Sequence, residues 1–235
     1  MLPDPSALRD RLLIGLTFAS GAVDAIAFLG LGKVFSAFMT GNLVFLGLGI
    51  GGADQPEIPR VLAALVAFAV GVFLAVKIVK PTRGSGIWPT RVSVALTLAA
   101  LAQAAFVLGW VITSGRPSTG AGNMLIALSA LALGIQSGAV MSLDVKGVFT
   151  TAATATLIML MSNEAGWSSS QVERRRLVGV LVALVTGAAA GTLALLHARA
   201  YAALLPLSAT LAVIAVAWIA FTPSGFPVAG ARRAD

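Results

Sequence analysis

A single aspartate, Asp24, stands inside the first long apolar run of the sequence, which extends from Leu12 to Leu31. A carboxylate at such a depth in a bilayer costs about 2.5–3.5 kcal/mol on insertion scales unless it is neutralised, hydrated or paired. The chemistry that this group could perform is to bind a proton or a cation on a transport path. The alternative is a protonated carboxyl that only hydrogen-bonds between helices. Because no Lys or Arg lies at a comparable depth of the run, the sequence indicates no partner for it.

Neutral polar residues in two short apolar segments could supply further contacts to a small solute. Thr40-Gly41-Asn42 lies within the segment Val34–Ile50. A glycine beside donors and acceptors suits an interrupted helix, which a membrane tolerates only where it is buried in protein or lines a wet cavity. The alternative is a short helix whose polar side chains bond to neighbouring helices. The residues predicted to line a substrate or ion path are Asp24, Thr40, Gly41, Asn42, Gln136, Ser137, Thr151 and Thr154.

The same inventory argues against other kinds of site. The chain has no cysteine and one histidine, and no close pair of carboxylates. We therefore expect no enzyme activity, no catalytic residues, no metal and no cofactor. The absence of a P-loop motif argues against a nucleotide-driven pump. The net charge is +7, but the basic residues lie in short gaps between apolar runs and form no stripe, so we expect no nucleic-acid partner.

Six apolar stretches are long enough to cross a hydrocarbon core of about 30 Å, which takes about 20 helical residues. The chain is 58% hydrophobic and 11% charged, whereas soluble domains have roughly 25% charged residues. We therefore expect an all-α membrane protein surrounded by a lipid bilayer. The six stretches are Leu12–Leu31, Val61–Val79, Val92–Ile112, Met124–Leu143, Leu177–Leu196 and Ala202–Phe221. The shorter segments Val34–Ile50 and Gly147–Met161 either cross fully or enter the membrane and return.

The two halves of this single transmembrane domain form a weak internal repeat, at about residues 12–113 and 122–222. Ser20-Gly21-Ala22-Val23 matches Ser137-Gly138-Ala139-Val140, and each half has one long, one short and two long segments in that order. If the short segments cross, the halves are parallel. If the short segments re-enter, three crossings in each half make the halves inverted.

Loop charge favours the second topology. Eight crossings with a cytoplasmic N-terminus would place nine Lys and Arg inside and seven outside. Six crossings with two re-entrant segments place twelve inside and four outside. The positive-inside rule therefore favours an inverted repeat with both termini in the cytoplasm.

Two further patterns concern helix packing and depth. The small-xxx-small spacing predicts close helix approach, either within a protomer or in a homo-oligomer, at Gly134 with Gly138 and Gly187 with Gly191. Tryptophans near the ends of segments are typical anchors at the membrane interface. The predicted anchors are Trp88, Trp110, Trp167 and Trp218.

A set of motifs in the first half is shared with a known family. Gly21 and Asp24 stand in the first apolar run, and Phe35 and Met39-Thr40-Gly41-Asn42 precede the next apolar stretch. In this pattern the chain resembles the YoaK family of bacterial membrane proteins, a family of unknown function also called DUF1275. Where that family commonly has T-G-T in the second half, this chain has Thr154-Ala155-Thr156. The resemblance implies a protein of the bacterial inner membrane and no particular substrate.

The predicted function is that of a small-solute secondary transporter or channel with an unknown substrate. Asp24 would carry the proton or the coupling cation, and the neutral residues would contact the solute. The rival prediction is a non-transporting membrane scaffold or accessory subunit, in which the same residues only hold helices together. The sign of the solute stays open, because the N-terminus of a half-helix favours an anion whereas an ionised Asp24 favours a cation.

Overall fold

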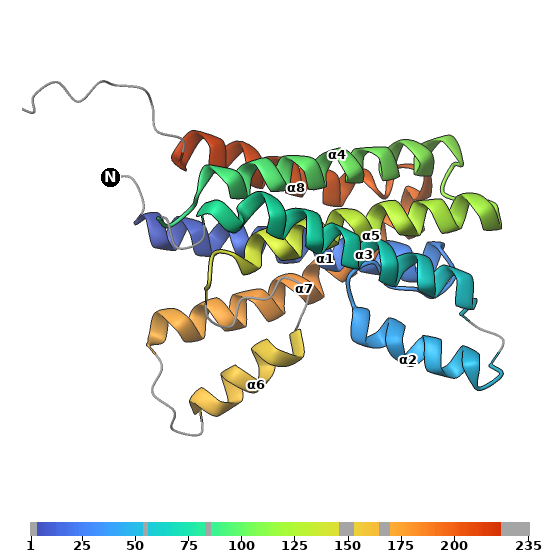
Figure 1. The fold of residues 1–235 in the computed structure, drawn as a ribbon, viewed down its shortest axis with the longest axis horizontal. Coiled ribbons are helices and arrows are strands. Elements are labelled where there is room, and N and C mark those ends of the chain that lie inside the picture. Colours follow the sequence, from blue (N-terminus) through green and yellow to red (C-terminus); the bar gives the residue numbers. More distant parts are fainter. Residues whose placement is uncertain (1–3, 54–55, 83–85, 146–152, 165–169, 222–235) are drawn as a thin grey trace, which may run out of the picture.

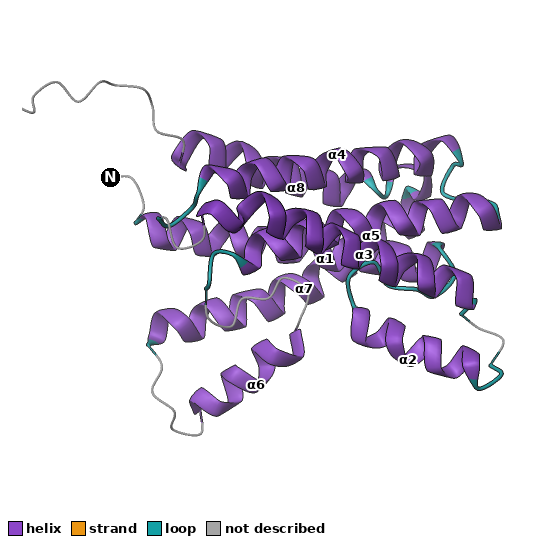
Figure 2. Cartoon of the chain, viewed as in Figure 1, coloured by secondary structure: helices purple, strands orange, loops and turns teal. Residues whose placement is uncertain are grey.

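The regular structure of the described residues is entirely helical (Figure 2). The computed structural model describes residues 4–53, 56–82, 86–145, 153–164 and 170–221. Six helices are long and apolar enough to cross a membrane. They are α1 (Pro5–Gly30), α3 (Ile58–Val79), α4 (Thr90–Ile112), α5 (Thr119–Met141), α7 (Gln171–His197) and α8 (Leu204–Phe221), the last preceded by the turn η2 (Arg199–Tyr201). The short helices are α2 (Met39–Ile50), α6 (Ala153–Glu164) and the turn η1 (Lys80–Thr82). The prediction of six long and two short apolar segments is confirmed.

The six long helices lie along one common axis and alternate in direction (Figure 1). The beginning of α1 and the end of α8 therefore lie at the same end of the bundle (Figure 1). The two short helices do not run the length of the bundle. Each begins near the middle of the long axis: α2 runs to the end where α1 stops and α3 starts, and α6 runs to the opposite end (Figure 1).

Capping residues determine where several helices begin. The Asp4 carboxylate accepts the backbone N–H of Ser6 at 3.2 Å, and Pro5 occupies the first turn of α1, where its missing N–H is of no consequence. The hydroxyl and amide of Ser6 lower the pKa of the Asp4 carboxyl below its ordinary value. At α7 the Ser170 hydroxyl accepts the N–H of Glu173 at 3.2 Å. These caps satisfy backbone donors that the helices cannot satisfy themselves.

Glycines allow two pairs of long helices to approach closely. Gly187 and Gly191 of α7 face α1, and Gly134 and Gly138 of α5 face α3. A Cβ atom at Gly187 would overlap the carbonyl oxygen of Phe18 on α1, and backbone atoms cannot turn aside as a side chain can. The predicted close approach through small residues is therefore confirmed, and it occurs within one chain.

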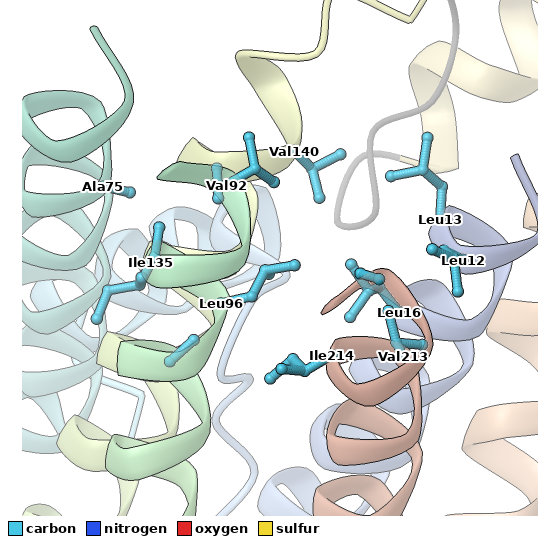
Figure 3. Packing of buried hydrophobic residues seen from close by; sticks show 14 of the residues in the cluster. Leu12, Leu13, Leu16, Ala75, Val92, Leu96, Ile135, Val140, Val213 and Ile214 are labelled. Carbon is cyan, nitrogen blue, oxygen red and sulfur yellow. The ribbon is translucent and has the colours of Figure 1, made fainter. Parts of the chain in front are cut away.

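Apolar side chains fill the interior between the long helices. Figure 3 shows Leu16 of α1, Leu96 of α4 and Ile214 of α8 directed into one shared space, where they belong to a single buried cluster. The outward faces are apolar as well, because Val185 is 69% exposed and Ile219 is 85% exposed. An apolar exterior of this kind is suited to contact with lipid.

Two of the predicted tryptophan anchors are wrong. Trp88 and Trp110 are buried in the protein and do not face the membrane interface. The indole Nε1 of Trp110 donates to the backbone oxygen of Arg199 at 2.7 Å, and that of Trp88 donates to Ser93 Oγ at 2.9 Å. A buried indole needs such a partner for its N–H, and the protein itself provides one in both cases. Of the other two, Trp218 is partly exposed and Trp167 lies outside the described residues.

Candidate solute-binding site

The helical chain is interrupted between α1 and α2, and residues 31–38 form a non-helical segment that we call the break. Two consecutive residues with positive φ reverse the chain there: Gly32 at +86° and Lys33 at +60°. A Cβ atom at Gly32 would overlap the guanidinium group of Arg60, whose Nη1 donates to the backbone oxygen of Leu31 at 3.1 Å. Glycine adopts this positive-φ conformation without strain, and its missing side chain leaves room for the guanidinium group.

Asp24 on α1 is bonded to the backbone of the break. Its Oδ1 accepts the N–H of Ser36 at 2.7 Å and the N–H of Ala37 at 2.8 Å. Two successive backbone N–H groups, just before the first residues of α2, thus converge on one carboxyl oxygen. This is the partner that the sequence did not indicate.

Asn42 in the first turn of α2 holds the other side of the break. Its Oδ1 accepts the N–H of Phe35 at 3.0 Å, and its Nδ2 donates to the backbone oxygen of Phe35 at 2.7 Å. The backbone N–H and C=O of Phe35 are therefore both hydrogen-bonded to the buried side chain of Asn42. A third attachment runs to α5, where the hydroxyls of Ser36 and Ser129 lie 2.7 Å apart.

A cavity of about 450 Å³ lies beside Asp24 and the break. Its walls come from α1, the break, the beginning of α6, and α7. Among the described lining residues most are apolar, and the polar side chains are those of Asp24 and Thr192. The described lining residues are Gly21, Asp24, Ala25, Phe28, Leu29, Phe35, Phe38, Ala153, Leu184, Ala188 and Thr192.

Three phenylalanine rings make up the aromatic part of this wall. The rings of Phe28 and Phe35 stack with centroids 4.8 Å apart, and the ring of Phe38 meets Phe35 edge-on at 5.2 Å. Gly41 leaves room for them, because a Cβ atom there would come within 2.7 Å of the Phe38 ring. Among the predicted site residues, Asp24, Gly41 and Asn42 are thus brought together around the break.

Of the predicted site residues, only Asp24 is among the described residues that line the cavity. Thr40 on α2 and Thr154 on α6 are exposed on the surface. Gln136 is buried and donates to the backbone oxygen of Leu16 at 3.3 Å, which links α5 to α1. Ser137 bonds to a carbonyl of its own helix at 2.7 Å. Thr151 lies outside the described residues.

Several groups at the site were missed by reasoning from the sequence. The donors of Ser36 and Ala37 are backbone N–H groups, so the types of these two residues do not predict their bonds to Asp24. The aromatic wall does leave a signal, because residues 28–45 contain four of the eleven phenylalanines of the chain. Thr192 lies far away in the sequence on α7 and reaches the cavity only through the close contact between α1 and α7.

Comparison with known proteins agrees with the fold and covers the site. The family described as "Protein of unknown function (DUF1275)" matches residues 12–217, a range that includes the break and every residue of the cavity wall. The UPF0700 transmembrane protein YoaK of Bacillus subtilis (strain 168) is 36% identical over 161 residues, which are 68% of this chain and 69% of that protein. No solved structure matches the chain. The chain is therefore a multi-pass membrane protein that belongs to the DUF1275 family.

Proposed function

We propose that this protein is a small-solute secondary transporter or channel of the bacterial inner membrane, and that the solute binds in the cavity beside Asp24. The observation that carries the proposal is the coincidence of three features at one place: a helix break, an intramembrane carboxylate and a cavity of about 450 Å³. Interrupted helices in a membrane are stable only when buried or lining a cavity. Secondary transporters use such interruptions to hold their solutes.

We further propose that the two halves are an inverted repeat. The support lies in matching contacts at opposite ends of the bundle. Arg60 near the start of α3 donates from Nε to Oδ1 of Asn123 near the start of α5, at 2.9 Å. Arg176 near the start of α7 pairs from Nη1 with Oδ2 of Asp10 near the start of α1, at 3.3 Å. The tight pairs α1–α7 and α3–α5 are then equivalent units, and alternating access is movement of one pair against the other.

The proposed orientation places both termini in the cytoplasm, and cysteine labelling tests it on a chain that contains no cysteine. Thr119 and Gln171 are exposed residues at the starts of α5 and α7, at opposite ends of the bundle (Figure 1). We expect a membrane-impermeant maleimide to label Thr119→Cys in intact cells and Gln171→Cys only after permeabilisation. The reverse pattern would contradict the orientation, and labelling of both from outside would contradict the six-crossing topology.

The scaffold alternative also has support in the structure. The two backbone hydrogen bonds to Asp24 and the two hydrogen bonds between Asn42 and Phe35 are contacts that a purely architectural role would require. The two functions differ in whether a solute crosses the membrane, so a flux measurement separates them.

Uptake of a panel of labelled small solutes into proteoliposomes is the deciding experiment. We expect the wild type and the control Thr40→Val to take up at least one class of solute. Asp24→Asn should slow that uptake roughly ten- to hundredfold, because a hydrogen bond to a charged group contributes about 1.5–3 kcal/mol. Uptake of no solute by the wild type, together with co-purification of a stoichiometric membrane partner, would favour the scaffold.

A further inference from the structure

We infer that the cavity beside Asp24 takes a small organic cation with an apolar body, such as an alkylated or aromatic ammonium ion. The inference rests on the binding site proposed above and adds the chemical class of its ligand. It follows from three properties of the site: the state of the α2 N-terminus, the charge of the wall and the aromatic rings.

The N-terminus of α2 already has an anion, which the protein itself supplies. The amino end of a helix carries a partial positive charge of about half a unit and attracts anions. The Asp24 carboxyl lies close to that end, because it accepts the N–H groups of Ser36 and Ala37 in the break just before α2. These two donors are therefore not available to an anionic solute.

In its ionised form the Asp24 carboxyl has room for further donors. A carboxylate offers about four lone-pair positions, of which the N–H groups of Ser36 and Ala37 fill two. These donors are neutral, so they leave the formal charge uncompensated. Among the described residues of the cavity wall there is no Lys, Arg or His. A cationic ligand would supply both the missing charge and, if it carries an N–H group, a further donor.

The rest of the wall suits the remainder of such a molecule. The rings of Phe28, Phe35 and Phe38 line the cavity, and aromatic rings bind quaternary ammonium groups through cation–π contacts. Leu184 and Ala188 of α7 add apolar surface to the wall. A volume of about 450 Å³ accommodates a benzylammonium-sized ion.

Ligand binding to the full-length, detergent-purified protein tests the inference. The cationic probes are choline and benzyltrimethylammonium. Their matched controls are dimethylbutanol, the uncharged carbon isostere of choline, and benzylsulfonate, an anion of similar shape to benzyltrimethylammonium. Calorimetry and ligand-induced thermal stabilisation give the affinities. We expect both cations to bind and both controls to bind at least about tenfold more weakly, as the loss of one charge-assisted contact predicts.

Two variants separate charge from architecture. Asp24→Asn keeps a carbonyl oxygen for the Ser36 and Ala37 donors and should weaken cation binding at least about tenfold. If that variant fails to fold, Phe28→Leu keeps the apolar volume and removes one ring. It should weaken benzyltrimethylammonium binding about two- to fivefold and leave dimethylbutanol binding unchanged, as expected for one cation–π contact. Thr40→Val, on the exposed face of α2, is the control and should bind like the wild type.

The outcomes distinguish this inference from the proposed function. Controls that bind as tightly as the cations, or cation affinities that neither Asp24→Asn nor Phe28→Leu reduces, would overturn the cationic ligand. Cation binding that depends on Asp24 but gives no flux in proteoliposomes would uphold the ligand class and overturn transport. Uptake of an anion or a neutral solute that depends on Asp24 would uphold transport and overturn the ligand class.

Discussion

Replacing Gly187 by leucine is expected to separate α1 from α7 and to abolish a stably folded protein. A side chain at Gly187 would occupy the position of the Phe18 carbonyl group, and a Cβ atom at Gly191, one turn further on, would lie 2.6 Å from the Ala22 carbonyl oxygen. Extra methylenes in a packed interior cost about 1–3 kcal/mol when side chains can rearrange, and a backbone carbonyl has less freedom to do so. Size-exclusion profiles and thermal unfolding of the detergent-solubilised protein measure the effect.

The control for this prediction is Gly47→Leu on α2. A Cβ atom at Gly47 would have no described atom within 4 Å, and the residue is exposed. Both substitutions gain about 1 kcal/mol of helix propensity, so the difference between the variants reports the packing alone. A monodisperse Gly187→Leu protein with the unfolding temperature of Gly47→Leu would show that the contact between α1 and α7 is not tight.

Replacing Asn42 by leucine is expected to release the break from α2. Leucine has nearly the same shape but cannot bond, so the N–H and C=O of Phe35 would both lose their partner in a buried place. Each unsatisfied buried group costs about 1–3 kcal/mol, which makes about 2–6 kcal/mol for the pair. The unfolding temperature in detergent should fall markedly. A reporter cysteine at Ala37, which is buried in the wild type, should become reactive toward thiol reagents.

Two variants on the same helix serve as comparisons. Thr40→Val, two residues away on the exposed face, should change the unfolding temperature little. Asn42→Asp keeps the acceptor for the Phe35 N–H and loses the donor to the Phe35 oxygen, so its effect should be intermediate. Equal stability of Asn42→Leu and Thr40→Val would mean that the Asn42 side chain does not hold the break.

Hydropathy predicts the long elements well because a bilayer fixes their length. A hydrocarbon core of about 30 Å demands about 20 residues per crossing, and all six predicted runs lie within or close to the helices found. Glycine spacing is equally informative, because removing side chains is the main way for two membrane helices to bring their backbones together. Gly134 and Gly187 were identified from spacing alone, and both lie at such contacts.

The inner arrangement of the site was less predictable. The identity of a residue shows neither where its backbone N–H and C=O groups point nor which face of a helix is buried. Thr40 and Asn42 are equally polar and two positions apart, yet a helix turns roughly 200° between them. One therefore points to the surface and the other into the protein. Asp24 was recognised as an unusual carboxylate, but its partners are amides of the break. Trp110 lies near a helix end, and only the fold shows that its indole N–H donates to the backbone oxygen of Arg199.

The attachments of the break also determine which part of the molecule it must follow. Hydrogen bonds from two backbone N–H groups anchor it to Asp24 of α1, whereas the described bond to α5 is one hydroxyl pair, Ser36 with Ser129. A single neutral hydrogen bond contributes about 1 kcal/mol, close to thermal energy, while bonds to a carboxylate are roughly twice as strong each. When α1 and α5 shift relative to one another, the hydroxyl pair breaks first. We expect the break to stay with α1 in such a movement, which also requires the bond from Arg60 of α3 to the backbone oxygen of Leu31 to be released.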